Sequence, residues 1–77
     1  MKKIINGLLY DTDKAELLWT ERLFRKVRNY YRTEKKNYFC VYANKEIYPM
    51  TEDEFKEYLG EKDPDRYIEL FGSPEEA

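Results

Sequence analysis

The feature that most limits the fold is a helix start signal in the last third of the chain. Thr51 and Glu54 have the spacing of a capping box, in which each side chain accepts a hydrogen bond from the other residue's backbone N–H. Met50 and Phe55 occupy the two positions of a hydrophobic staple around the same point. We therefore expect a helix that begins after Thr51 and ends at Gly60, with the glycine in the left-handed cap conformation.

A second helix signal follows directly. Asp63 is a favourable N-cap, and Pro64 fits the first helical position, where its missing N–H costs nothing. Tyr67 and Phe71 share one helical face, and Gly72 is placed to end the helix. Two consecutive C-terminal helices are thus predicted, followed by a frayed tail at residues 73–77.

The N-terminus has the pattern of a tight β-hairpin. Asn6 and Gly7 tolerate positive φ angles and lie between two apolar pairs, at residues 4–5 and 8–9. This spacing predicts a strand, a two-residue turn and a second short strand.

A short helix is predicted after this hairpin. Asp13 and Glu16 repeat the capping-box spacing, and Ala15, Leu18 and Trp19 fall on one helical face. The segment has room for about two turns.

Aromatic and β-branched residues dominate from about Arg22 to Tyr48, which favours three antiparallel strands. The polar stretch 33–37 and the short stretch 43–45 would connect them. The whole order predicts one α+β domain at residues 1–72: a β-hairpin and short helix, a three-stranded antiparallel meander, and two C-terminal helices packed on one sheet face. The other sheet face would meet water or a partner.

The composition argues against an enzyme. The 77 residues include no histidine, so the usual acid/base group at neutral pH is missing, and the only serine, Ser73, lies near the C-terminus. Cys40 has no partner for a disulfide and no base to activate it, so a small buried hydrophobe is the simpler role. Asp63, Asp65 and Glu69 could chelate a divalent ion, but helix capping explains Asp63 without one. We expect no catalytic residue, no cofactor and no metal.

Export signals are not evident in the sequence. No apolar run approaches the roughly 18 residues of a membrane helix, and the apolar stretch after Met1 is too short for a signal peptide. We therefore expect a protein of the bacterial host cytoplasm that does not bind membranes.

Charge is segregated along the chain. Residues 22–36 contain seven basic residues and one acidic residue, a net charge of +6. Residues 51–77 contain ten acidic and three basic residues, a net charge of −7. The chain thus has a basic middle and an acidic end, although its total charge is only −2.

The basic stretch suggests a sheet surface that binds nucleic acid. In one extended strand, alternate residues would place cations and aromatics on a single face, where aromatics stack on bases and cations meet phosphates. Those residues are Arg22, Phe24, Lys26, Arg28, Tyr30 and Arg32. The alternative is a solvated face whose charge the acidic helices balance, and the pI of about 5.2 favours this alternative.

The acidic stretch suggests the opposite kind of partner. A row of helical carboxylates resembles a phosphate backbone and could occupy the basic groove of a nucleic-acid-binding protein. The candidate residues are Glu52, Asp53, Glu57 and Glu61, with Asp65 and Glu69 beyond them. The alternative is an ordinary solvated helix, with acids near its N-terminus favoured by the helix dipole.

Four segments also carry a resemblance that spans nearly the whole chain. They are KIING with YDT and Ala15 near the N-terminus, Tyr31-Arg32 through Tyr38-Phe39, IYPMTEDE at residues 47–54, and DRYIELFG at residues 65–72. In these the chain resembles a family of small, mostly uncharacterised proteins of bacteria, phages and mobile elements. Relatives often carry a longer, glycine-rich connection after the Tyr-Phe strand, which here is only Ala43 to Lys45. The resemblance brings no catalytic residues, and it implies a setting of genetic conflict in which small charged proteins block host defence.

These observations lead to one main hypothesis. The chain is expected to be a non-enzymatic phage or mobile-element inhibitor of the anti-CRISPR type that binds a host defence protein or ribonucleoprotein complex, as a monomer or homodimer. The acidic positions named above would form the binding surface, with the strand residues Arg25, Arg28 and Tyr30 as a second surface. A nucleic-acid-binding module using the basic aromatic sheet face is the alternative. A third hypothesis is an accessory protein that oligomerises through its aromatic surface.

Overall fold

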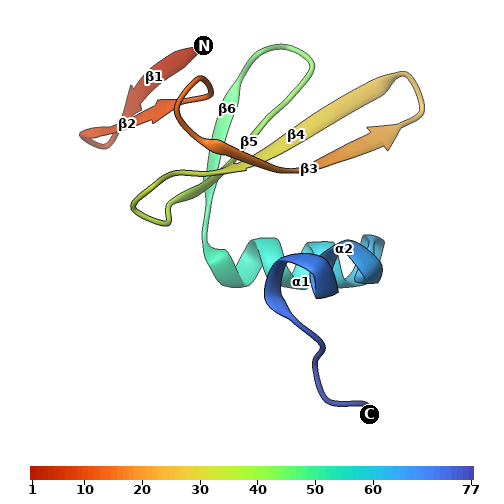
Figure 1. Ribbon diagram of the computed structural model, residues 1–77. Coiled ribbons are helices and arrows are strands. Elements are labelled where there is room, and N and C mark those ends of the chain that lie inside the picture. The colour runs from red at the N-terminus through yellow and green to blue at the C-terminus, as the bar shows by residue number, and fades with distance from the viewer.

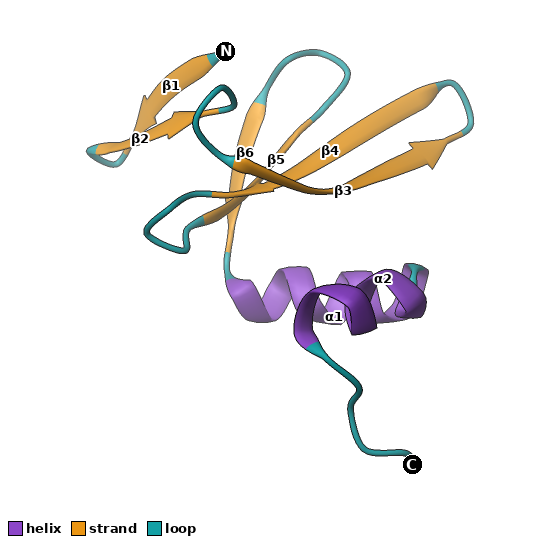
Figure 2. Cartoon of the chain, viewed as in Figure 1, coloured by secondary structure: helices purple, strands orange, loops and turns teal.

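A computed structural model describes all 77 residues of the chain as an α+β fold. Figures 1 and 2 show two antiparallel sheets, one of two strands and one of four, with both helices beneath the larger sheet. The elements in chain order are β1 (Lys2–Ile5), β2 (Leu8–Asp11), β3 (Glu16–Leu23), β4 (Lys26–Arg32), β5 (Tyr38–Val41), β6 (Ile47–Met50), α1 (Glu52–Lys62) and α2 (Pro64–Phe71). Residues 73–77 are exposed and form neither helix nor strand.

The predicted N-terminal hairpin is confirmed as β1 and β2. Asn6 and Gly7 form its turn with φ angles of 51° and 78°, which allow the primed turn that matches the strand twist. Tyr10 on β2 packs edge-on against Phe39 of β5, with ring centroids 5.2 Å apart. The hairpin therefore covers part of the sheet face opposite the helices.

The predicted short helix is wrong, because its residues form strand β3. β3 pairs with β4, and the pairing register shifts between Leu17 and Trp19. At this β-bulge, two consecutive residues, Leu18 and Trp19, contact the same core. Adjacent apolar residues break the alternation of a regular strand, and in the sequence they look like one face of a helix. Pairing with the aromatic strand β4 also offers more burial than an isolated helix of two turns.

The three-stranded meander is present but is part of a larger sheet. β4, β5 and β6 are antiparallel neighbours, and β3 adds a fourth strand beside β4. The strand predicted to run on from about Arg22 is interrupted by a two-residue turn at Phe24 and Arg25, because Leu23 pairs with Lys26. Arg22 therefore lies on β3, and the single face expected from Arg22 to Arg32 does not exist.

Helix α1 begins as predicted and ends later than predicted. The backbone N–H of Glu54 donates to Thr51 Oγ1 at 3.0 Å, and the N–H of Thr51 donates to Glu54 Oε1 at 2.8 Å. The helix continues through Gly60 to Lys62, so the predicted stop at Gly60 is wrong. Asp63, three residues beyond that glycine, ends α1 and caps α2.

Helix α2 follows the predicted signals at both ends. The Asp63 side chain accepts from the backbone N–H of Arg66, Pro64 is the first helical residue, and Gly72 follows the last turn with a φ of 90°. Both helices pack on one face of the four-stranded sheet. The core between them consists of Leu18, Tyr30, Tyr38, Cys40, Phe55 and Leu59.

Candidate functional site

The predicted acidic surface lies on α1 and is exposed. Asp53, Glu57 and Glu61 are four residues apart in turn, so their carboxylates form one stripe along the helix. None of the three takes part in an ion pair. Glu52 differs, because its carboxylate is 3.1 Å from the ammonium group of Lys56. We call Asp53, Glu57 and Glu61 the acidic stripe.

The predicted exposure of Tyr30 is wrong. Its side chain is 4% exposed and lies under α1, where the ring centroid is 5.7 Å from that of Phe55. The even-numbered residues of β4 point toward the helices, so α1 covers much of the face that the sequence suggested for nucleic acid. Tyr30 is a core residue and cannot stack on a base.

The cations near Tyr30 are engaged within the protein. The Arg28 guanidinium lies 3.7 Å from a Glu21 carboxylate oxygen and 4.5 Å from the Tyr42 ring centroid. Arg32 donates to Glu16 at 2.9 Å. Arg28 is half-buried, so less of its side chain is open to a partner than the sequence suggested, and Glu21 partly neutralises its charge.

A buried carboxylate that the sequence analysis missed organises this region. Glu21 on β3 is 6% exposed and accepts hydrogen bonds from the hydroxyl groups of Tyr30, at 3.1 Å, and Tyr58. Burial and the negative charge of Glu21 raise the pKa of the Tyr30 phenol, and the hydrogen bond to Glu21 raises the pKa of Tyr58. Because every partner comes from a different element, the network fixes β3, β4 and α1 together. Only the correct strand pairing would have identified Glu21.

The turn between β3 and β4 presents a different cationic surface. Phe24 is 87% exposed, and the Arg25 guanidinium lies 5.1 Å from its ring centroid. Arg22 and Lys26 flank this turn, and none of the three cations takes part in an ion pair. We call Arg22, Phe24, Arg25 and Lys26 the basic tip. Of the predicted second surface, Arg25 lies at this tip, while Arg28 and Tyr30 lie in the network below it.

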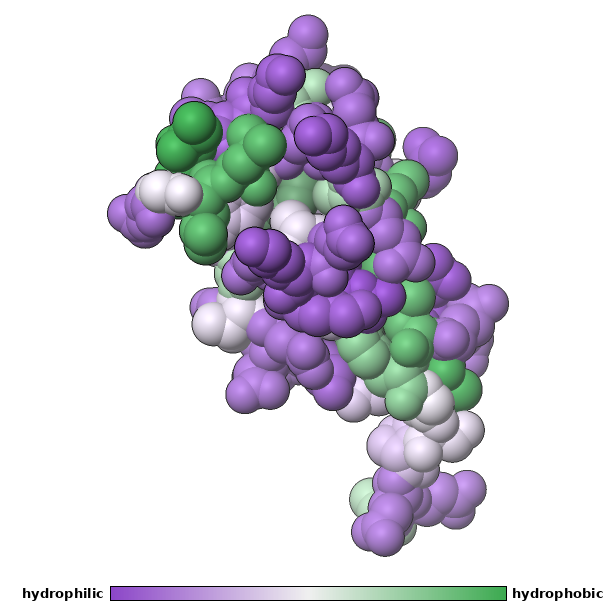
Figure 3. All heavy atoms as spheres, turned by 60° about the vertical axis from the view of Figure 1, so that its left-hand side comes forward, coloured by the Kyte–Doolittle hydropathy of each residue, from purple (hydrophilic) through white to green (hydrophobic).

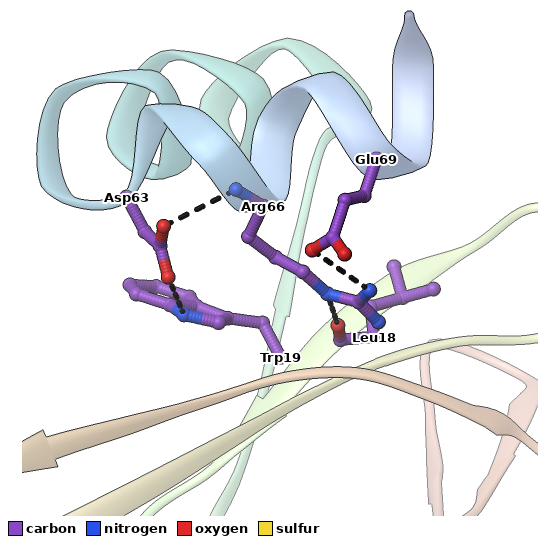
Figure 4. A network of polar contacts seen from close by, with 5 residues as sticks. All are labelled: Leu18, Trp19, Asp63, Arg66 and Glu69. Atoms are coloured by element: carbon purple, nitrogen blue, oxygen red, sulfur yellow. Dashed lines mark hydrogen bonds and ion pairs between the residues drawn. The ribbon is translucent and has the colours of Figure 1, made fainter.

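Cys40 and Asp63 have the structural roles predicted for them. Cys40 is buried in the core, and burial raises the pKa of its thiol to about 11. Asp63 accepts hydrogen bonds from the Trp19 indole and from the backbone N–H of Arg66, both at 3.2 Å (Figure 4). The Arg66 guanidinium in turn donates to the Leu18 carbonyl at 2.8 Å, which joins α2 to the edge of the sheet. No group of three or more carboxylate or thiol side chains is placed to share a metal ion.

An apolar patch lies on the N-terminal hairpin. Figure 3 shows it as the green region at upper left, and the side chains of Ile4, Leu8 and Leu9 are exposed there. A hollow of about 490 Å³ lies next to it, between the hairpin and the β4–β5 connection, with Lys14 and Lys35 among its lining residues. Asp11 is the buried carboxylate of this lining, and it accepts a hydrogen bond from the backbone N–H of Asp13 at 3.0 Å.

Comparisons with family models, curated proteins and solved structures found no match to this chain. The family resemblance in the sequence therefore stays a prediction. Neither helix has the length and apolar content needed to cross a membrane.

Proposed function

We propose that this protein is a non-enzymatic inhibitor, encoded by a phage or mobile element, that binds a nucleic-acid-handling host defence protein in the bacterial cytoplasm. Inhibition of the anti-CRISPR type is the form that the sequence resemblance favours. The acidic stripe on α1 would occupy a groove that normally holds nucleic acid. The observation that carries the proposal is that three exposed carboxylates lie in a row without any cationic partner.

The geometry of the stripe suits a groove built for a phosphate chain. Residues four apart on a helix are about 6 Å apart along its axis, so the three carboxylates form a regular row of negative charge. Like charges at this spacing destabilise an isolated helix slightly. A groove lined with lysine and arginine would relieve this repulsion on binding and would be attracted over a distance of about 8 Å in physiological salt.

The helix that carries the stripe is rigidly held, which favours binding without reorganisation. Phe55 and Leu59 anchor its opposite face in the core, and the capping box fixes its first turn. Tyr58 ties it to β3 through Glu21. The charges are thus presented in one arrangement, which lowers the entropic cost of association.

Affinity capture from the lysate of the natural host tests this proposal. The tagged protein is expected to retain a defence nuclease or a subunit of a guide complex after nuclease treatment of the lysate. A variant with Asp53, Glu57 and Glu61 changed to lysine should lose this partner, because three negative charges become positive and would be repelled by a basic groove.

The matched control reverses three acids outside the stripe. Glu34, Glu75 and Glu76 are all exposed, and their change to lysine alters the net charge by the same amount. This control should retain the partner, and both variants should keep the far-UV circular dichroism of the original. Retention of the partner by the stripe variant, or its loss from both variants, would contradict binding through the stripe.

The other two functions considered from the sequence have less support. Much of the sheet face proposed for nucleic acid is covered by α1, which buries its aromatic residue Tyr30. Oligomerisation through aromatics would require several exposed rings in one surface, whereas most of the large rings are buried or half-buried. The two aromatic residues with the largest exposed fractions, Phe24 and Tyr48, lie after β3 and on β6, which are opposite edges of the four-stranded sheet. Sedimentation at high protein concentration tests oligomerisation directly.

A further inference from the structure

The basic tip stands at the end of an arm that only two strands form. β4 pairs with β5 from Asn29 to Arg32, whereas its residues from Lys26 to Arg28 pair with β3 alone. Figure 1 shows this end of the β3–β4 hairpin projecting beyond β5 and β6 at the right of the view. The tip can therefore reach a partner that does not fit against the rest of the sheet.

The side chains at the tip combine one open aromatic ring with concentrated positive charge. Phe24 has the highest exposed fraction, 87%, among the exposed large hydrophobic residues. A single exposed apolar side chain is common and would carry no inference by itself. Here, however, the Arg25 guanidinium lies beside the ring, and Arg22 and Lys26 lie within two residues of Phe24 on the two strands of the hairpin. None of these cations makes an ion pair, although acidic residues are abundant elsewhere in the chain.

We infer that the basic tip binds single-stranded nucleic acid, with one base stacked on Phe24 and the adjacent phosphates contacting Arg22, Arg25 and Lys26. Aromatic platforms flanked by cations bind single strands in this way without needing a specific base sequence. Arg25 already lies near the Phe24 ring, where a guanidinium can support a stacked base through a cation–π contact.

The charge pattern favours this occupant over a protein. In protein–protein interfaces, the residues that contribute most to affinity lie in an apolar centre from which water is excluded. If Phe24 docked into such a centre, the neighbouring Arg25 and Lys26 would lose their hydration at a cost in free energy. A single-stranded polyanion pairs with those cations directly. Duplex nucleic acid does not expose base faces, so it would meet the cations without stacking on Phe24.

This inference does not depend on the inhibitor proposal, since it concerns different residues and needs only the purified chain. Fluorescence anisotropy of labelled oligothymidine and oligouridine of about 12 nucleotides, a length typical of one such site, measures the affinity. At about 50 mM salt we expect micromolar dissociation constants that weaken steeply as salt is raised. Phe24→Ala should weaken binding roughly 5- to 150-fold, the range of one base–aromatic stack.

The matched controls separate stacking from charge and from general damage to the fold. Phe24→Trp should retain affinity, and its added fluorescence should be quenched by the oligonucleotide. Ile4→Ala removes another exposed apolar side chain and should leave affinity unchanged. Changing Arg22, Arg25 and Lys26 to glutamine should reduce the slope of log affinity against log salt by about 2, whereas the same change at Lys2, Lys14 and Lys35 should not.

Three results would overturn the inference. One is the absence of binding at high micromolar protein in low salt. Another is equal affinity of the original protein and Phe24→Ala for the oligonucleotides. The last is a duplex of the same length that binds as tightly as the single strands, because that would indicate attraction by charge alone.

Discussion

Each connection within the four-stranded sheet places a basic residue in backbone geometry that favours glycine. Arg25, Lys36 and Lys45 have φ angles of 64°, 69° and 64° in the three successive turns. The left-handed conformation costs a residue with a side chain roughly 1 kcal/mol or more. Strain of this kind is often retained where the side chain has a function.

Replacing Arg25 with glycine therefore has opposite expected effects on stability and on binding. Arg25→Gly should raise the free energy of unfolding by about 1 kcal/mol, because glycine adopts this φ without strain. The same variant should weaken oligonucleotide binding, because it removes one cation of the basic tip. Urea unfolding and anisotropy measure the two effects.

Lys36→Gly is the matched control, since Lys36 has nearly the same φ in a turn outside the basic tip. It should give a similar gain in stability without a change in affinity. A loss of stability in both variants would show that the turns do not store this strain.

At the scale of elements, the two C-terminal glycines have different roles although they look alike in sequence. Gly60 lies inside α1, and a Cβ added there would be 3.5 Å from the Tyr67 ring, an ordinary contact distance. Gly60→Ala should therefore stabilise the protein by about 1 kcal/mol, since alanine is the better helix former. Gly72→Ala should destabilise it, because Gly72 has a φ of 90°. Thermal unfolding followed by circular dichroism measures both changes. A destabilised Gly60→Ala variant would contradict the uninterrupted helix.

The elements that sequence predicted are those specified by neighbouring residues. The turn at Asn6 and Gly7, the capping box at Thr51 and the cap at Asp63 each depend on a few adjacent positions, and all three are confirmed. β3 could not be recognised in this way. Its bulge at Leu18 gave a helical spacing, and its turn at Phe24 and Arg25 contains neither glycine nor asparagine.

The residues of the candidate site also fall into two groups, those that local sequence located and those that depend on contacts between elements. Exposure of the acidic stripe follows from helix periodicity, so the sequence located Asp53, Glu57 and Glu61 correctly on an open face. Burial of Tyr30 depends on α1 packing over β4, and the network at Glu21 depends on pairing between β3 and β4. Tyr58 lies 37 residues from Glu21, and local patterns do not encode contacts at such separations. The β3–β4 pairing is closer in sequence, but no glycine or asparagine marks its turn.

At the scale of the whole molecule, the core contains two weakly acidic groups, the Cys40 thiol and the Tyr30 phenol, and their burial favours the protonated form. Burial raises the pKa of the Cys40 thiol from 9.0 to about 11, and burial beside Glu21 raises that of Tyr30 above its ordinary value of 10.0. The folded protein thus holds both protons more tightly than the unfolded chain does. The resulting stabilisation is fully present below pH 9 and declines as the pH rises, because the unfolded chain releases these protons first.

We therefore expect the free energy of unfolding to fall by on the order of 2 kcal/mol between pH 9 and 11, from the thiol shift alone. Urea unfolding at a series of pH values measures this decline. Cys40→Ala should remove the part that begins near pH 9, and Tyr30→Phe should reduce the part above pH 10 while leaving the thiol part in place. Both variants lower stability at neutral pH, since each alters the core, so the comparison is of slopes with pH and not of absolute values. A decline of equal slope in the original and in both variants would mean that surface charge, and not the core, sets the alkaline limit.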